Sequence, residues 1–181
     1  IDDYRIAKLK AAERLGMSSR GSLPGNAEIE QAVSEHLKLF GRELHVNRLY
    51  ILRRAALSAM DMLAPFAPRL VGPVLHGTAS ANSPVNLHVF TDSAELVAIW
   101  LQENSVQYRP FERRLKSRRD QAKTFAAFRF QQGESNVEAT VFPIDGVRHA
   151  PISPVDGKPM RRADKDEILE LLMDPGSGAM S

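Results

Sequence analysis

Residues 75–90 read LHGTASANSPVNLHVF, and this segment gives the clearest view of how the chain is built. Its second half, Val85 to Phe90, alternates apolar and polar residues, the period of two that predicts a half-buried β-strand. Its first half places Gly77-Thr78 and several small residues after the apolar segment Leu70 to Leu75, which we also interpret as a strand. The segment therefore predicts two strands joined by a loop of small residues, and it contains no Asp or Glu.

Two helices are predicted before this segment. Apolar residues recur at helical spacing from Ile29 to Phe40, so we expect a helix that is capped by Asn26 and stops at Gly41. A second helix is predicted from Val46 to Leu63. Pro65 and Pro68, which follow it, are expected to end it. The apolar stripe of this second helix consists of Leu49, Leu52, Ala56, Met60 and Leu63.

A helix and a short strand are predicted after the segment. Asp92 and Glu95 have the spacing of a capping box, and the helix that they begin is expected to run through Asn104. Val106 to Arg109 is interpreted as a short strand. The helix is expected to bury Leu96, Val97, Trp100 and Leu101.

Two more strands are predicted at Thr124 to Phe130 and Val137 to Phe142, joined by a hairpin loop over residues 131–136. The Pro- and Gly-rich segment from Asp145 to Arg162 is expected to be irregular. A last helix, capped by Asp164 and Glu167, is expected to bury Ile168, Leu171 and Leu172.

The order helix, helix, strand, strand, helix, strands, helix predicts an α+β fold, in which a small mixed β-sheet packs against helices. A chain of 181 residues favours one domain. We expect an N-terminal arm over residues 1–22, a single domain over residues 23–172, and a disordered tail over residues 173–181. The helical part of the domain, residues 23–66, forms an N-terminal extension.

Composition excludes several classes of protein. Apolar residues make up 43% of the chain and charged residues 25%, an ordinary mix for a globular domain. No apolar run approaches the roughly 20 residues that span a bilayer, so no membrane partner is expected. There is no cysteine, which excludes disulfides, zinc–thiolate sites and a cysteine nucleophile. A cysteine-free chain is compatible with the reducing cytoplasm, and we expect a cytoplasmic protein.

The basic residues are clustered, although the net charge of +2 is too small to require a polyanionic partner. Residues 109–119 hold six basic side chains against one acid, Glu112. This run is either the solvated face of a helix or loop, which needs no partner, or a patch that binds phosphates. In the second interpretation Arg113 and Arg114 are the candidate contacts, because a guanidinium donates hydrogen bonds in a planar fork.

Three segments of the sequence resemble the DNA polymerase β-like nucleotidyltransferases. They are FAPRLVGPVLHGTASANSPVNLHVF (residues 66–90), RRL (residues 113–115) and PVDGKPMRRA (residues 154–163). The sequence looks like that of a group of small bacterial proteins of that fold, and the resemblance covers about residues 46–172. The resemblance implies a nucleotidyltransferase-like sheet. It also implies that Gly77, Thr78 and Ser83 contact a phosphorylated ligand, since glycine admits a close phosphate and hydroxyls donate hydrogen bonds.

In that superfamily three acidic residues hold two divalent metals: a pair one position apart on the second strand, and a third on a later strand. One alignment places the pair at Pro84 and Asn86, and a register shifted by two places it at Asn86 and His88. Neither alignment supplies a carboxylate, whereas Glu138 matches the third acid. Because Mg²⁺ prefers carboxylate oxygens, the resemblance implies the fold without ordinary two-metal transfer. No cofactor is then required, and Mg²⁺ is expected only if the protein is active.

Asn86 and His88 share one face of their strand, which has two interpretations. If that face lines a cleft they contact a ligand, and if it is solvated they have no role; we favour the solvated face. Glu138 is the candidate catalytic residue, and its alternative is a solvated acid at a sheet edge.

Three functions remain open. The first is a degenerate transferase, a pseudoenzyme that binds a nucleotide or phosphorylated small molecule without efficient transfer. The second is an active nucleotidyltransferase in which Glu138 works with Asp92 or Asp145. The third is a non-enzymatic interaction or regulatory module whose helices dimerise or dock a partner. Nucleic acid and an oligomer remain compatible with the sequence. The ligand-binding residues expected in the first function are Gly77, Thr78, Ser83, Asn86, His88, Arg113 and Arg114.

Overall fold

The computed structural model describes residues 25–117 and 121–174. The chain divides into two units, residues 1–47 and residues 48–181, and the boundary falls inside one helix. Each unit is therefore described by itself. The predicted N-terminal arm and the last seven residues of the predicted tail lie outside the described residues.

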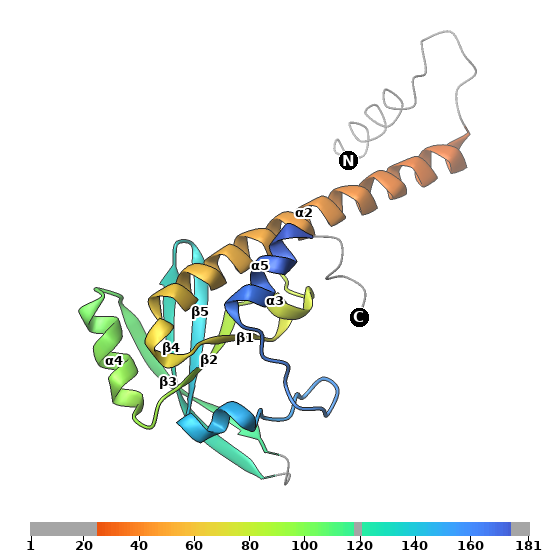
Figure 1. Cartoon of the computed structure of the whole chain (residues 1–181). Coiled ribbons are helices and arrows are strands. Elements are labelled where there is room, and N and C mark those ends of the chain that lie inside the picture. Colours follow the sequence, from red (N-terminus) through yellow and green to blue (C-terminus); the bar gives the residue numbers. More distant parts are fainter. Residues whose placement is uncertain (1–24, 118–120, 175–181) are drawn as a thin grey trace. The chain divides into compact units, whose positions relative to one another are not determined.

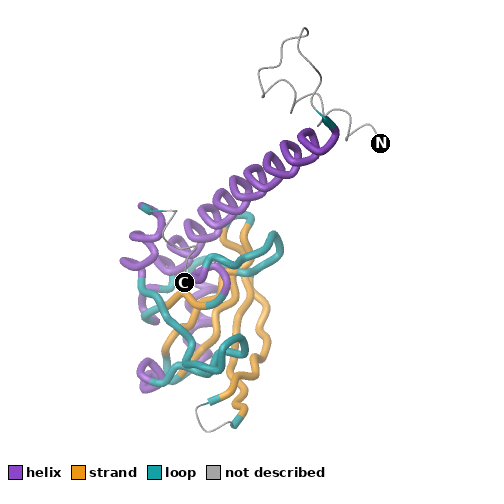
Figure 2. The backbone as a smooth tube through the Cα atoms, turned by 90° about the vertical axis from the view of Figure 1, so that its right-hand side faces the viewer, coloured by secondary structure: helices purple, strands orange, loops and turns teal. Residues whose placement is uncertain are grey.

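The architecture of residues 48–181 is α+β, as predicted, and its centre is one mixed five-stranded sheet. The strand order is β1-β2-β5-β4-β3, and Figure 2 shows the strands as one layer. The central β2–β5 pair is parallel, and the other neighbouring pairs are antiparallel. The strands are β1 (Arg69–Val71), β2 (Val85–Phe90), β3 (Tyr108–Lys116), β4 (Ala122–Gln132) and β5 (Ser135–Phe142).

Along the chain, a long helix precedes the sheet, and shorter helices lie between its strands and after the last one (Figure 1). The α-helices are α2 (Asn26–Met62), α3 (Pro73–His76), α4 (Ala94–Glu103) and α5 (Lys165–Met173). Two short 3₁₀ helices, η1 (Ala64–Phe66) and η2 (Ile144–Arg148), lie in the connections. Within the described ranges no helix is long and apolar enough to cross a bilayer.

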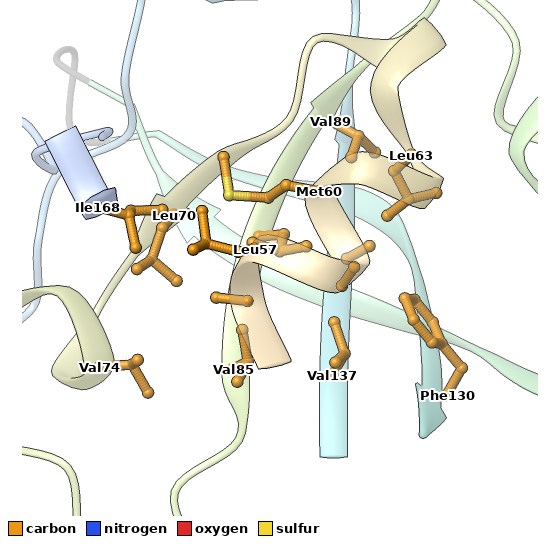
Figure 3. Close-up of a cluster of buried hydrophobic side chains, with 14 of the residues drawn as sticks. Leu57, Met60, Leu63, Leu70, Val74, Val85, Val89, Phe130, Val137 and Ile168 are labelled. Atoms are coloured by element: carbon orange, nitrogen blue, oxygen red, sulfur yellow. The ribbon is translucent and has the colours of Figure 1, made fainter. Parts of the chain in front are cut away.

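The hydrophobic core lies between the sheet and the second half of α2. Because strand side chains alternate in direction, β2 turns Val85, Leu87 and Val89 to one face, and all three are fully buried. Figure 3 shows the side chains of Leu57 and Met60 from α2, and of Leu63 just after it, close to side chains from β2, β4 and β5. The predicted apolar stripe of this helix is therefore confirmed, since Leu49, Leu52, Ala56, Met60 and Leu63 are all buried.

The prediction of two separate helices before the sheet was wrong, because α2 is continuous through Gly41. A glycine inside a helix costs only about 1 kcal/mol relative to alanine, which one position among 37 can accommodate. The apolar side chains of the first half of α2 are not all buried: Leu37 is 60% exposed and Phe40 is 51% exposed.

The strand predicted from Leu70 to Leu75 is present but shorter, and its second half was predicted wrongly. β1 ends at Val71, and the short helix α3 begins two residues later. Gly72 and Pro73 stand at the N-cap and first turn of α3, and Gly77 ends it in the left-handed conformation with φ of 83°. Proline at the start and glycine at the end are a helix signature, so Gly77 closes a helix rather than a strand.

The prediction that Asp92 and Glu95 form a capping box at the start of α4 was wrong. Ser93 occupies the N-cap position and makes no side-chain capping bond, while the Asp92 carboxylate accepts a hydrogen bond from the Ile144 amide at 3.2 Å. Asp92 therefore ties α4 to η2. Of the four side chains expected to be buried on α4, Val97 and Leu101 are buried, Trp100 is partly buried, and Leu96 is 52% exposed.

The predicted cap of the last helix is confirmed. The Asp164 carboxylate accepts a hydrogen bond from the Glu167 amide at 3.0 Å, and Ile168 is fully buried. The hairpin predicted around residues 131–136 is confirmed as the antiparallel β4–β5 pair, although both strands run further than expected.

The basic run is a strand, not a solvated helix or loop. Its described part lies in β3, which extends the short strand predicted at Val106 to Arg109 by pairing along its full length with β4. Neighbouring side chains in a strand point to opposite faces. Arg113 and Arg114, predicted to act together, are therefore on opposite sides of the sheet.

Candidate functional site

The face of the sheet opposite the core carries polar and aromatic side chains, and we call it the polar face. Residues paired across neighbouring strands point to the same side, so the register defines which side chains share it. Asn86 pairs with Glu138, and Glu138 pairs in turn with Arg129. The side chains on the polar face include Asn86, His88, Phe90, Arg109, Phe111, Arg113, Phe125, Ala127, Arg129, Glu138, Thr140 and Phe142.

Glu138 lies at the centre of the polar face and is 8% exposed. Its Oε1 accepts hydrogen bonds from Arg129 Nε at 3.1 Å and Arg129 Nη2 at 2.8 Å. Its Oε2 accepts a hydrogen bond from Arg113 Nη2. Two guanidiniums, one of them bidentate, therefore neutralise this buried carboxylate and occupy both of its oxygens.

Arg113 reaches Glu138 from β3 by crossing β4 at a small residue. Ala127, a small residue on the intervening strand, pairs with Thr140, which Arg113 contacts. Arg113 Nη1 also donates to Asn86 Oδ1 at 3.3 Å and to Thr140 Oγ1 at 3.4 Å. One arginine thus connects side chains from three strands.

Phe111 supports both guanidiniums that hold the central acid. The guanidinium carbon of Arg113 lies 5.3 Å from the ring centroid, and that of Arg129 lies 5.1 Å from it. A cation over an aromatic face is attracted by the ring quadrupole. This contact fixes the two arginines side by side on the polar face.

His88 is 1% exposed and neutral by virtue of its contacts. Its Nδ1 accepts a hydrogen bond from Arg162 Nε at 3.0 Å, which requires the ring nitrogen to be unprotonated. Burial lowers the pKa of His88 well below its usual value, and the positive charges of Arg162 and Arg113 lower it further. A buried histidine beside cations is therefore an acceptor here and not a proton carrier at neutral pH.

Arg162 reaches the polar face from the segment before α5. Its guanidinium lies over the rings of Phe90 and Phe142, at 4.8 and 4.9 Å from their centroids. Its Nη1 donates to the carbonyl oxygens of Gly146 at 2.8 Å and Val147 at 3.2 Å. Its Nη2 is buried and has no hydrogen-bond partner in the described part of the chain.

The polar face is strongly cationic. Arg69 in β1 pairs with His88, so it joins Arg113, Arg129 and Arg162 on the same side of the sheet as the Glu138 carboxylate. Burial lowers the pKa of Arg162 to about 10, with a contribution from Arg69, which leaves Arg162 charged at neutral pH. Clustered charge of one sign attracts ions of the other sign, so this face favours an anionic ligand.

The residues present do not fit the two-metal centre that the resemblance implies. Both oxygens of Glu138 accept hydrogen bonds from guanidiniums, and Asn86 Oδ1 and His88 Nδ1 accept hydrogen bonds from Arg113 and Arg162. Across residues 25–117 and 121–174 there is no group of three or more His, Cys, Asp or Glu side chains that could hold a metal.

Four of the predicted site residues are brought together on the polar face: Asn86, His88, Arg113 and Glu138. The favoured interpretation of this face as solvated was wrong, because His88 and Glu138 are buried under arginine side chains. Arg114 is not part of the cluster, because its side chain is exposed on the other face of β3.

The loop of small residues is a separate local structure. The Ser83 hydroxyl accepts a hydrogen bond from the Ser80 amide at 2.9 Å and lies 3.2 Å from the Ser80 hydroxyl. The Thr78 amide donates to the Pro73 carbonyl at 3.0 Å. No hydrogen bond between described residues joins Thr78 or Ser83 to Glu138, so the structure does not place them at the cluster.

Gly72 lies in close contact with the polar face. Gly72 has a φ of 78°, and a Cβ added there would lie 3.3 Å from Nδ2 of Asn86. This glycine therefore lets the chain pass directly beside the polar face. The Gly72-Pro73 pair could have been recognised from sequence as the start of a helix.

Arg129, Thr140 and Arg162 are the functional candidates that sequence reasoning missed. Arg129 stands between two buried phenylalanines in β4, and a charge in that position of an alternating strand indicates the opposite face. Arg162 belongs to a small basic group with Lys158 and Arg161, but no strand or helix pattern indicates which face it reaches. Comparison with known proteins adds nothing further, because no family model, curated protein or solved structure matches the chain.

Proposed function

We propose that the polar face binds the phosphate groups of a nucleotide or another phosphorylated small molecule. The observation that carries this proposal is the convergence of Arg113 and Arg129 on the Glu138 carboxylate, with Arg162 bonded to His88 on the same face. Guanidiniums bind phosphate oxygens in pairs of parallel hydrogen bonds. The proposal fits a degenerate nucleotidyltransferase, the first of the functions that the sequence leaves open.

The arginines keep donors for a ligand while they hold Glu138. The side chain of Arg129 is 54% exposed, and it uses only Nε and Nη2 on the carboxylate. An arginine has five N–H donors, so Arg129 can contact a phosphate without releasing the acid. Arg162 contributes charge and holds the neighbouring backbone in place.

Inefficient transfer is part of the same proposal. Two-metal transfer needs carboxylates that are free to hold both metals, and here the one central acid is paired with two arginines. The alternative of an active enzyme with Glu138, Asp92 or Asp145 predicts transfer of labelled nucleotide onto protein or RNA. An unchanged transfer rate in the Glu138→Ala variant would rule out that alternative.

Titration calorimetry of the full chain with ATP, CTP, GTP, UTP and inorganic tripolyphosphate tests the proposal. At least one phosphorylated ligand should bind, and Arg129→Gln should weaken its binding about tenfold, because a charge-assisted hydrogen bond contributes about 1.5–3 kcal/mol. Arg114→Gln is the matched control on the opposite face of the sheet, and it should leave the Kd unchanged. No heat with any ligand at millimolar concentration would contradict the proposal.

A second candidate, an interaction module, is favoured by the first half of α2. Exposed fractions are 60% for Leu37, 56% for Leu39, 51% for Phe40 and 47% for Leu44. Exposed apolar side chains grouped on one helix are typical of a surface that binds a partner, and a second copy of the chain is the simplest one. Sedimentation equilibrium showing a strict monomer at high micromolar concentration would count against this function.

A cytoplasmic location belongs to the same proposal, because nucleotides are abundant there and the chain has no cysteine to oxidise. Nucleic acid is a further candidate partner, since an RNA backbone would meet the same arginines. Titration with a single-stranded RNA oligonucleotide at several salt concentrations distinguishes the two ligands, because backbone binding weakens steeply with salt.

A further inference from the structure

A cavity of about 540 Å³ lies at one end of the polar face, beyond the arginine cluster. Its aromatic side is formed by Phe125 of β4 and Phe142 of β5, whose ring centroids are 4.6 Å apart. Leu115 of β3 adds an aliphatic side chain to the same wall. The volume is within the range of about 300–1,000 Å³ that is usual for small-molecule sites.

The opposite wall of the cavity is held in place by specific bonds. It consists of η2 and the residues that follow it, up to Pro151. Arg162 donates to the Gly146 carbonyl at 2.8 Å, and the Ile152 amide donates to the Lys116 carbonyl at 2.9 Å. Figure 1 shows η2 beside the sheet, close to the ends of β3 and β4. These bonds connect the wall to Arg162 and to the end of β3.

Gly146 determines how closely this wall approaches the aromatic side. It is buried, and a Cβ added there would lie 3.3 Å from Cβ of Phe142. The wall and the aromatic side thus meet at one edge of the cavity. This geometry leaves a space that is bounded by a ring on one side and by backbone on the other.

The cavity is next to the arginine cluster on the same face. Phe125 pairs directly with Arg113 across β3 and β4. Along β5, Phe142 is two residues from Thr140, a contact of Arg113, and four residues from Glu138. At about 3.3 Å per residue these separations are roughly 7 and 13 Å. A ligand with an aromatic group and a phosphate joined by one sugar would reach both places.

The side chains around the cavity suit a flat ring with polar edges. Phe125 is half-buried and offers a π-face for stacking, while Phe142, which is buried, packs behind it. Ser117, Gln121 and Asp145 also line the cavity and offer polar groups. Lys123 and His149 also line it and place basic groups near the incoming ligand. Stacking on aromatic side chains tolerates any base, because every base has a π-face.

We propose that this cavity binds the base of a nucleotide whose phosphates lie on Arg113 and Arg129. The inference rests on the proposed phosphate binding and adds the class of ligand: a nucleotide rather than a phosphorylated sugar or a free polyphosphate. The aromatic cavity selects the base, and the arginines contribute affinity for the phosphates.

The test compares the Kd of inorganic tripolyphosphate with that of each nucleoside triphosphate, using calorimetry on the full chain. At least one nucleotide should bind about tenfold more tightly than tripolyphosphate, the gain typical of one stacked base. Phe125→Leu should remove that gain and leave the Kd of tripolyphosphate unchanged. Arg129→Gln should weaken both ligands.

Two further variants keep the test decisive if Phe125→Leu unfolds the protein. Lys123→Gln changes an exposed lining residue and should weaken nucleotide binding but not alter the thermal midpoint. Lys165→Gln, on the exposed side of α5, is the control and should change neither Kd. Equal Kd values for nucleotides and tripolyphosphate, or full nucleotide affinity in Phe125→Leu, would overturn the base site but leave phosphate binding intact. Failure of every ligand to bind would instead overturn the proposed function.

Discussion

At the scale of single residues, Glu138 is the acid on which the polar face is organised. A buried carboxylate is costly unless it is paired and hydrogen-bonded, and two guanidiniums meet that requirement here. The arginines depend equally on the acid, because without it two cations would lie together on one face. Glu138 therefore stabilises the cluster in addition to limiting its charge.

Replacing this acid should affect stability and binding in opposite directions. We expect Glu138→Gln to lower the free energy of unfolding by about 2 kcal/mol, since hydrogen bonds to a charged group are lost. The same variant should bind tripolyphosphate more tightly, because Arg113 and Arg129 lose their internal anion. Urea unfolding and calorimetry measure the two effects. Glu134→Gln, in the exposed β4–β5 turn, is the control, and an unchanged urea midpoint for Glu138→Gln would contradict the ion-pair account.

His88 should make the folded protein sensitive to acid. Its pKa in the folded state is lowered well below 6.5, so below about pH 6.5 the unfolded chain binds a proton that the folded chain does not. Stability should therefore fall by about 1.4 kcal/mol per pH unit as the pH drops from 6.5 toward the folded-state pKa.

The pH dependence of the urea midpoint checks this expectation. His88→Asn keeps an acceptor for Arg162 and cannot be protonated, so it should reduce the slope between pH 6.5 and pH 5. His149→Asn, which replaces an exposed histidine, should retain the wild-type slope. Identical slopes in wild type and His88→Asn would show that another group causes the acid sensitivity.

The sequence indicated some of these residues and not others for a physical reason. Asn86, His88 and Glu138 belong to alternating strands, so their common direction follows from the period of two. Arg162 contacts His88 across 74 positions of the chain. A contact of that kind depends on the tertiary fold, and nothing in the local pattern around Arg162 predicts it.

At the scale of elements, α3 holds the chain beside the polar face and depends on one buried arginine. Arg53 of α2 is 4% exposed and donates to the carbonyl oxygens of Val74 at 3.0 Å and Leu75 at 3.1 Å. These carbonyls are at the C-terminal end of α3, where a helix lacks internal donors. Burial also lowers the pKa of Arg53.

Removing this contact should destabilise the protein by about 2 kcal/mol, because Arg53→Met leaves two buried carbonyls without a donor. Arg54→Met is the matched control, since Arg54 is exposed on the next position of the same helix. Chemical unfolding of both variants gives the comparison. Equal unfolding midpoints would show that Arg53 does not anchor α3.

Gly72 should tolerate substitution poorly. Gly72→Ala adds a Cβ at a φ of 78° and places it 3.3 Å from Asn86, so we expect a loss of about 1–3 kcal/mol. Gly133→Ala also has a positive φ, of 61°, but its Cβ meets nothing within 4 Å, and it should cost less. A thermal midpoint for Gly72→Ala at or above that of Gly133→Ala would contradict this role.

Elements were predicted well where one face is apolar and badly where it is not. β2 and β5 have that alternation, and both were predicted. β3 carries charged or exposed side chains on both faces, so the period of two is hidden and most of the strand was missed. α3 has four residues, too few for a helical period to be visible.

At the scale of the whole molecule, the fold class was predictable but the strand order was not. Alternation and capping signals gave an α+β fold with a mixed sheet. The central pair, β2 and β5, is parallel and joins strands that are separated in sequence by α4, β3 and β4. This pair brings Asn86 beside Glu138, so the site could be assembled only once the sheet order was known.

The most direct test of the central claim is the dependence of nucleotide binding on divalent metal. Calorimetry on the full chain with the tightest-binding nucleotide gives its Kd in EDTA and in millimolar Mg²⁺. If arginines bind the phosphates, the Kd in EDTA should equal or be lower than that in Mg²⁺, since the metal competes for phosphate charge. Binding that requires Mg²⁺, or that persists unchanged in the Arg113→Gln/Arg129→Gln double variant, would contradict the account.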